Sequence, residues 1–275
     1  MKHVVMGPTG LGSWAAAKRV AERHGTDDLW LVFADVKGNS LSPHAGEDED
    51  AYRFITEAAA NVGGTLVTLN EGRDIWQVFH DNRFLGNSRL ANCSKFLKQQ
   101  PCREWLDANC DPTDTTVYVG IDWSESHRLP AIERAYLPFK AEAPMTEAPF
   151  MDRVDVEKWC ISEGIDIPRL YAAGFPHNNC GGFCVRAGQA QFKLLLDVHP
   201  ERYAYHEAKE EELRQYLDAD VAILRDRALP KTTATVGNSV PLTLRKFRER
   251  IEDQPAMFDA LDFGGCGCFV AEEVS

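Results

Sequence analysis

The amino-acid sequence predicts an α/β fold, in which a twisted parallel sheet carries helices on both faces. Short apolar runs at residues 4–6, 29–35, 65–69 and 117–121 are typical of buried strands. The segments between them favour helices, so strands and helices alternate over the first 121 residues. This alternation is typical of a parallel sheet, because each connection between parallel strands has to cross one face of the sheet.

The composition is that of a soluble globular protein. The chain has 275 residues, of which 44% are hydrophobic and 26% are charged, so it can bury a sizeable core. No apolar run is as long as a membrane-spanning helix and the N-terminus lacks the apolar region of a signal peptide, which predicts a cytoplasmic protein without a membrane partner. A formal net charge of −12 argues against non-specific binding to nucleic acids, although a local basic groove is compatible with it.

The most informative stretch is the first strand–helix unit. Residues 4–6 form its strand, residues 7–13 (Gly-Pro-Thr-Gly-Leu-Gly-Ser) are too rich in glycine and proline for regular structure, and residues 14–20 favour a helix. A strand, a glycine-rich loop and a helix N-terminus together point backbone N–H groups at an anion, usually a phosphate. The alternative is a tight turn in an ordinary strand–helix unit.

The glycine loop departs from two common phosphate-binding patterns. Ser13 stands where the Walker pattern requires a lysine, and position 15 is alanine where the dinucleotide pattern requires a third glycine. The loop is similar in part to the pyrophosphate loop Ser-Gly-Gly-x-x-Ser of adenine-nucleotide hydrolase-like enzymes, since Gly10 and Ser13 match its second glycine and its last serine. Pro8 and Thr9 replace the first Ser-Gly, and the proline removes a backbone donor.

Charged side chains follow two other predicted strands. Asp35 ends the strand at residues 29–35, and Glu125 and Arg128 come shortly after the strand at residues 117–121. Ligands of parallel sheets bind at the carboxyl ends of the strands, so these side chains are predicted at the same edge as the glycine loop. Alternatively, Asp35 caps the loop that follows it. Arg128 and Lys98 are candidates for binding phosphate or sulfate, with surface salt bridges as the alternative.

Eight cysteines in a cytoplasmic chain favour metal binding or redox chemistry over a disulfide framework. Cys180 and Cys184 form one close pair, Cys266 and Cys268 form another, and both pairs are embedded in glycine. Four thiolates are suitable ligands for zinc or for an iron–sulfur cluster, and the spacing does not decide between them. Unliganded thiols are the alternative for these pairs. Three further cysteines are predicted to be packing residues: Cys102, Cys110 and Cys160.

Several motifs in order resemble the phosphoadenosine phosphosulfate (PAPS) reductase-like family of the adenine nucleotide alpha hydrolase (PP-loop) superfamily. Besides the glycine loop and Asp35, they are Cys93-Ser-Lys-Phe-Leu-Lys98-x-x-Pro101, Gly120-x-x-x-x-Glu125-x-x-Arg128 and Leu170-Tyr171-x-x-Gly174-Phe175. Asp122 stands where arginine is common in the family. The resemblance weakens beyond residue 200.

This resemblance implies a Rossmann-type sheet that binds ATP or PAPS at the glycine loop. It implies nucleotide contacts from seven residues: Gly10, Gly12, Ser13, Asp35, Lys98, Glu125 and Arg128. It also implies that Cys93 is a ligand of an iron–sulfur cluster, together with Cys180, Cys184 and a thiol of the tail. Zinc is the alternative metal.

Members of this family differ in the reaction that they catalyse. Some reduce the sulfonucleotide with a thioredoxin-like reductant, and Cys266, which is followed by glycine, then becomes the candidate nucleophile. Others adenylate an acceptor such as a nucleoside or a nucleic acid, with release of pyrophosphate and with Mg²⁺ on the ATP. A third hypothesis is a non-catalytic module that binds a nucleotide or a metal, because the glycine loop is altered.

Two units are expected along the chain. Residues 1–150 are predicted to form a nucleotide-binding α/β domain. Residues 151–275 are predicted to form a smaller helical subdomain that carries the metal-binding cysteine pairs.

Overall fold

The computed structural model describes residues 1–7, 9–87, 90–226 and 240–264. Its centre is a five-stranded parallel sheet with strand order β3-β2-β1-β4-β5, so the predicted fold class is confirmed. The strands are β1 (Lys2–Met6), β2 (Leu29–Asp35), β3 (Thr65–Asn70), β4 (Thr115–Tyr118) and β5 (Lys140–Glu142).

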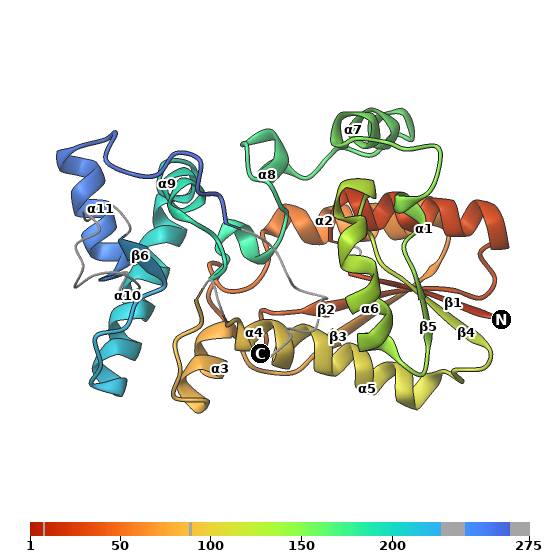
Figure 1. Ribbon diagram of the computed structural model, residues 1–275, viewed down its shortest axis with the longest axis horizontal. Helices are drawn as coiled ribbons and strands as arrows, with labels where there is room; N and C mark the ends of the chain where they lie inside the picture. The colour runs from red at the N-terminus through yellow and green to blue at the C-terminus, as the bar shows by residue number, and fades with distance from the viewer. Residues whose placement is uncertain (8, 88–89, 227–239, 265–275) are drawn as a thin grey trace.

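Helices cover both faces of this sheet (Figure 1). Val5 of β1 packs on one face with helices α1 (Leu11–His24), α2 (Glu49–Val62) and α7 (Arg153–Ser162). Its neighbours Val4 and Met6 pack on the other face with α5 (Gln100–Asn109) and α6 (Leu129–Tyr136). Because successive side chains of a strand point to opposite faces, a strand buried on both sides reads as a continuous apolar run.

The order of the strands fixes where a ligand can bind. β1 and β4 are direct neighbours, and Val5 of β1 is in register with Tyr118 of β4. From β1 the chain continues through β2 to β3 on one side of the sheet, and from β4 it continues to β5 on the other side. The two connections therefore leave the sheet in opposite directions at the β1/β4 boundary, which creates a crevice at the carboxyl ends of these strands.

The C-terminal part is mainly helical, with α8 (Arg169–Ala172), α9 (Gln189–Val198), α10 (Pro200–Leu217) and α11 (Leu244–Asp253). It also holds a two-stranded antiparallel sheet of β6 (Leu224–Asp226) and β7 (Val240–Leu242). Helix α3 (Ile75–Asp81) shares a hydrophobic core with this part, since Trp76 and Phe79 pack in the same cluster as Phe192 and Tyr203. That core combines residues from both sides of position 150, and the division into two units at this position stays a prediction.

Pro101 lies within continuous helical structure. Helix α4 (Asn92–Ser94) passes into a π-helical segment, Lys95–Gln99, and then into α5. The proline follows the π-helical segment directly, in the first turn of α5, and it has no N–H group to donate to the preceding helical turn.

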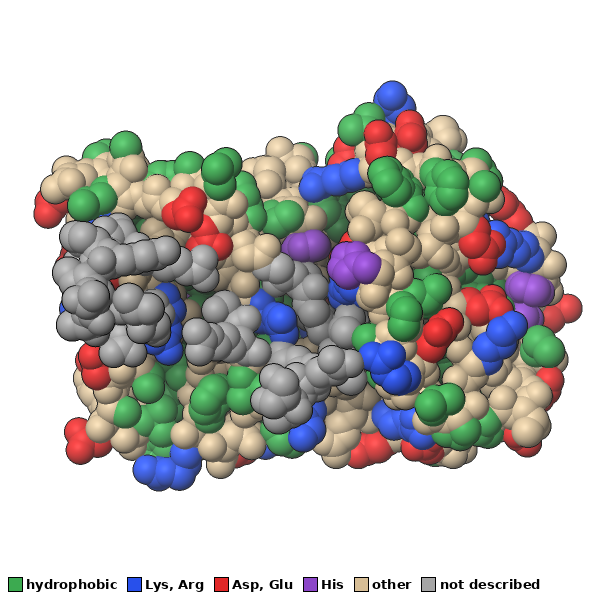
Figure 2. Space-filling model, in the orientation of Figure 1, with side chains coloured by type: hydrophobic (Ala, Val, Ile, Leu, Met, Phe, Trp, Pro, Cys, Tyr) green, Lys and Arg blue, Asp and Glu red, His purple; other side chains and the backbone are tan. Residues whose placement is uncertain are grey.

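Residues 130–150 contain regular structure. A 3₁₀ turn, Trp123–Arg128, leads into α6, and Pro130 lies in the first turn of that helix. Strand β5 and a second 3₁₀ turn, Pro144–Thr146, follow. Throughout the part of the chain that the structure describes, no helix is long and apolar enough to cross a membrane. Acidic, basic and apolar side chains are interspersed over the face seen in Figure 2.

Candidate functional site

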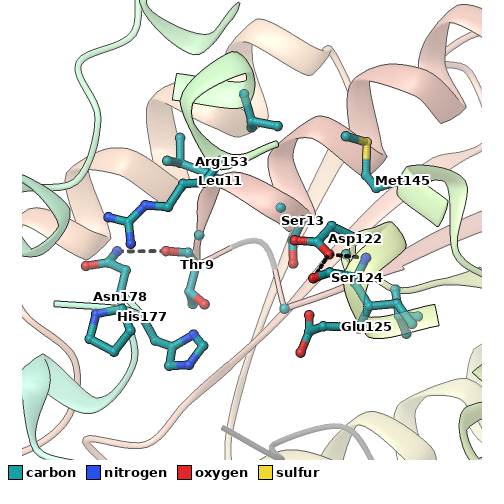
Figure 3. A pocket seen from close by; sticks show the side chains of 18 of the residues that line it. Thr9, Leu11, Ser13, Asp122, Ser124, Glu125, Met145, Arg153, His177 and Asn178 are labelled. Atoms are coloured by element: carbon teal, nitrogen blue, oxygen red, sulfur yellow. Dashed lines mark hydrogen bonds between the residues drawn. The ribbon is translucent and has the colours of Figure 1, made fainter. Parts of the chain in front are cut away.

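A cavity of about 320 Å³ opens at the carboxyl ends of β1 and β4, in the crevice that the strand order creates. Figure 3 shows Ser13, Asp122 and Glu125 on one side of the glycine loop and Arg153 and His177 on the other. Five residues predicted to bind a nucleotide line this cavity: Gly10, Gly12, Ser13, Glu125 and Arg128.

The glycine loop leads directly from β1 into α1. Gly7 has a positive φ of 67°, and its N–H group donates to the carbonyl of Val32 over 2.9 Å. Helix α1 starts after Gly10. Within the described chain no side chain caps this helix, and its first turn carries no acidic residue. Because the first N–H groups of a helix have no partner inside it and carry partial positive charge, this end of the cavity is suited to an anion.

Close contacts explain the glycines around the cavity. A Cβ atom on Gly12 would lie 2.5 Å from the carbonyl oxygen of Gly120, and a Cβ on Gly120 would lie 2.4 Å from the backbone nitrogen of Ser13. A Cβ on Gly10 would lie 2.7 Å from the hydroxyl of Tyr171. The first turn of α1 can therefore approach the end of β4 closely only because glycine stands on both sides.

Two arginines line the cavity, and each is paired with a carboxylate. Arg128 forms an ion pair with Glu125 three residues earlier in the chain. Arg153 pairs with Glu157 at 2.8 Å, and its guanidinium lies 4.6 Å from the centroid of the Tyr171 ring. Arginine can bind phosphate or sulfate oxygens through two parallel hydrogen bonds, so these two side chains can bind further negative charge of a ligand.

His177 lies in the wall of the same cavity. Burial lowers the pKa of this histidine below its usual value, while Glu125 acts in the opposite direction. The imidazole is therefore neutral at pH 7 and can both donate and accept a hydrogen bond. The sequence analysis includes Tyr171 in a motif but gives it no role in the site, and it does not find Arg153. No local pattern marks Arg153, because only the fold brings it to the glycine loop.

Asparagines tie the wall around His177 to the glycine loop. The side-chain amide of Asn178 donates to the carbonyl of Thr9 over 2.7 Å, as Figure 3 shows. The hydroxyl of Thr9 donates to the side-chain oxygen of Asn179 over 3.2 Å. Thr9 is therefore held by side chains from a segment about 170 residues further along the chain.

Asp35 does not line the cavity. Its carboxylate accepts a hydrogen bond from the backbone of Lys37 over 2.9 Å and another from the hydroxyl of Tyr52 over 2.8 Å. These bonds match the alternative reading of the sequence, in which Asp35 caps the following loop. A role of Asp35 in nucleotide binding stays a prediction.

Lys98 lies in a second, much smaller cavity of about 20 Å³. This side chain is buried and forms an ion pair with Glu47 at 3.2 Å, and the other oxygen of Glu47 accepts a hydrogen bond from the backbone of Cys180. Three of the predicted metal ligands line this second cavity, which we call the thiol pocket: Cys93, Cys180 and Cys184. The structure thus places Lys98 with the cysteines and not in the glycine-loop cavity.

Among the described residues, no group of three or more histidine, cysteine, aspartate or glutamate side chains is arranged to hold a metal ion. Cys266 and Cys268, which the sequence predicts to complete the ligand set, lie outside those residues, as does Pro8. Burial raises the pKa of Cys102 to about 12 and that of Cys160 to about 11, so both are protonated thiols at neutral pH.

Comparisons with known proteins find similar solved structures but no matching family model or curated protein. Among solved structures, the chain is similar to a crystal structure of phosphoadenylyl-sulfate (PAPS) reductase from Candida auris in a phosphate complex. The identity is 14%, the alignment covers 65% of this chain and 80% of that chain, and the TM-score is 0.44.

Proposed function

We propose that this chain binds an adenine nucleotide at the glycine loop and uses it in sulfur chemistry. The observation that carries the proposal is the N-terminus of α1, which no described side chain caps and which opens into a cavity at the β1/β4 boundary of a parallel sheet. Phosphate groups bind at such helix ends, and nucleotides bind at such boundaries of open α/β sheets.

The lining of the cavity supports separate roles for its parts. The N–H groups at the start of α1 and the hydroxyl of Ser13 would bind one phosphate group. Arg128 and Arg153 would bind a second anionic group, and the apolar side chains of Met145 and Met151 would contact the base or the ribose. This division gives a ligand with two separate charged groups a complementary partner for each.

Two reactions are compatible with such a ligand. In a sulfonucleotide reductase, a cysteine thiolate, with Cys266 as the candidate, attacks the sulfur of PAPS. The S–O bond to the nucleotide breaks, adenosine 3′,5′-bisphosphate leaves, and a thioredoxin-like reductant then releases sulfite from the cysteine. In an adenylating enzyme, an acceptor attacks the α-phosphorus of ATP and pyrophosphate leaves, with its charge neutralised by the Mg²⁺ that enters with ATP.

Calorimetric titration with PAPS and with ATP tests the binding step. We expect micromolar binding of at least one of them, and Arg153→Ala should weaken it about ten-fold, the loss expected for one charge-assisted hydrogen bond. Arg103→Ala is the matched control, because it removes a similar ion pair, to Asp107 at 2.9 Å, outside the cavity. If neither nucleotide binds at millimolar concentration, the proposal is wrong.

Two assays separate the reactions once binding is established. A reductase turns over PAPS with thioredoxin, whereas an adenylating enzyme releases pyrophosphate from ATP when the acceptor is present. Binding without either reaction would identify a non-catalytic nucleotide-binding module.

We also propose a thiol-bound metal centre, an iron–sulfur cluster or zinc, in the thiol pocket. It is supported by Cys93 and by the distant pair Cys180 and Cys184, which line one pocket. Thiolates are the usual ligands of both centres, and a fourth would have to come from Cys266 or Cys268. Absorbance near ~400 nm after anaerobic purification indicates a cluster, whereas zinc without absorbance indicates a zinc site. Protein without either metal would contradict this proposal.

A further inference from the structure

The cavity at the glycine loop and the thiol pocket are built from one continuous segment. Residues 176–179 line the first cavity, and Cys180 and Cys184 line the thiol pocket. The two groups meet at a 3₁₀ turn, Cys180–Gly182, in which all three residues have positive φ, with a value of 53° at Cys180. A left-handed conformation is unfavourable for a residue with a side chain, so the surrounding contacts must hold this turn in place.

Contacts on all sides of the turn restrict its movement. The backbone N–H of Cys180 donates to Glu47, and the carbonyl of Gly182 accepts a hydrogen bond from the side chain of Gln191 over 2.8 Å. A Cβ atom on Gly181 would lie 2.1 Å from the guanidinium of Arg202, so the backbone approaches this buried arginine closely. A group bound at the cysteines therefore cannot displace the turn without moving the residues next to it.

Asn178 carries such a movement to the glycine loop. Its side chain is only 2% exposed, and its amide nitrogen is bonded to the carbonyl of Thr9. Its side-chain oxygen is buried without a hydrogen-bond partner among the described residues. Because this amide has one strong contact, and that contact is with the glycine loop, Thr9 follows Asn178 when the turn moves.

We propose that Asn178 is a positioning residue through which the state of the Cys180 and Cys184 thiols controls the glycine loop. A thiophilic group bound at these cysteines, such as a metal ion, changes the affinity of the loop for the phosphates of a nucleotide. By linkage, the nucleotide changes the affinity of the cysteines for that group by the same factor. The predicted change in nucleotide affinity rests on the proposed function, whereas the predicted movement of the glycine loop is independent of it.

Reversible blocking of the thiols with methyl methanethiosulfonate tests this coupling. Each thiolate forms an S–S bond to the methylthio group and methanesulfinate leaves, so no further oxidant is needed. A reductant restores the thiol. Mass spectrometry of peptides shows whether Cys180 and Cys184 carry the methylthio group. The Cys180→Ala/Cys184→Ala variant shows any effect of blocking the other cysteines.

The first readout is hydrogen exchange of the amides of residues 9–13 without any nucleotide. We expect exchange there to become about ten-fold faster after blocking, since one buried hydrogen bond is weakened, and to recover after reduction. The double alanine variant should not respond to the reagent. Asn178→Asp should exchange fast in both states, because its carboxylate cannot donate to Thr9. Asn82→Asp, which removes a similar bond to the carbonyl of Val78 over 2.8 Å, should behave as the parent does.

The second readout is the dissociation constant of ATP and of PAPS in both thiol states. We expect a change of about ten-fold in the parent and less than two-fold in Asn178→Asp. Unchanged exchange at residues 9–13 after blocking would overturn the inference, and so would an Asn178→Asp variant that responds as the parent does. Altered exchange without binding of either nucleotide would support the coupling and disprove the proposed function.

Discussion

The glycines at the cavity face neighbours of different kinds. Gly120 faces the backbone of Ser13, which cannot move without shifting the start of α1, whereas Gly10 faces the hydroxyl at the end of the Tyr171 side chain. Replacement of each glycine by alanine should therefore have different effects, because the Tyr171 hydroxyl can be removed by substitution and the backbone of Ser13 cannot.

We expect Gly120→Ala to lower the free energy of unfolding by about 1–3 kcal/mol, the usual range for overpacking against fixed atoms. Gly10→Ala should also destabilise the protein, but Tyr171→Phe should restore most of the loss because it removes the oxygen that the new methyl group meets. Urea unfolding of the three variants and of the two pairwise combinations with Tyr171→Phe measures this difference. If Tyr171→Phe restored the stability of Gly120→Ala and of Gly10→Ala equally, the contact between Gly10 and the Tyr171 hydroxyl would not explain the loss.

Single residues also show how far the sequence predicts the site. Ser13 lies in the first turn of α1, after β1, and Arg128 lies in the 3₁₀ turn that follows β4. The edge of the sheet brings segments that follow neighbouring strands together in any fold of this class. Asp35 ends a strand too, but the hydroxyl of Tyr52 in α2 donates a hydrogen bond to its carboxylate, and this contact depends on helix packing. Lys98 lies on a helical segment whose direction the motif does not specify. Arg153 and Asn178 come from the C-terminal part, whose placement over the loop has no local signal.

At the scale of elements, α1 is fastened to the loop between β5 and α7. Arg19 of α1 is buried, and its guanidinium donates to the carbonyls of Pro144 over 2.8 Å and of Glu147 over 3.0 Å, and also to that of Pro149. This loop carries Met145 into the wall of the cavity. The same helix therefore presents its N-terminus to the cavity and supports the loop that carries Met145.

Arg19→Met should reduce the free energy of unfolding by about 2–4 kcal/mol, since it leaves several buried carbonyls without a donor. Arg23→Met is the control on the same helix. Arg23 pairs with Glu147 at 2.9 Å on the surface, and such pairs contribute about 0–1 kcal/mol. Thermal unfolding of both variants gives the comparison, and equal losses would show that burial of Arg19 is unimportant.

Elements with a clear apolar pattern are predictable from the sequence, and elements without one are not. Helices α2 and α9 have apolar positions at helical spacing over ten residues or more, so periodicity finds them. Strand β5 is Lys-Ala-Glu, with one buried side chain, and gives no pattern to detect. Strand β6 has the same length of three residues, and its pairing with β7 depends on contacts between distant segments.

At the scale of the whole molecule, the buried carboxylate of Glu210 links parts of the C-terminal core. It accepts a hydrogen bond from the backbone of Ile223 over 2.9 Å and another from that of Leu244 over 2.6 Å. Burial raises the pKa of Glu210 from 4.5 to about 7, against the opposing effects of these two bonds and of Arg214, while Glu211 adds to the rise. The folded protein therefore binds a proton at Glu210 more tightly than the unfolded chain does.

This shift predicts how stability depends on pH. Between pH 4.5 and about 7 the folded state holds more of this proton, so the contribution of Glu210 to stability falls as the pH rises through this window. Glu210→Gln has no such proton and should show a smaller fall between pH 5 and pH 7.5, measured as urea midpoints. Parallel pH profiles of the parent and the variant would exclude Glu210 as the source.

Because of the π-helical segment at residues 95–99, the direction of Cys93 depends on the number of residues in this part of the chain. A π turn holds one more residue than an α turn, and one residue corresponds to a rotation of about 100° around the helix axis. With α5 fixed on the sheet, that extra residue sets the direction in which Cys93 faces, and Cys93 faces the thiol pocket. A deletion of one residue at this point would convert the segment to an ordinary helix and turn Cys93 away, even though every element would remain. The number of residues between Cys93 and α5 is therefore as necessary for the thiol pocket as the cysteine itself.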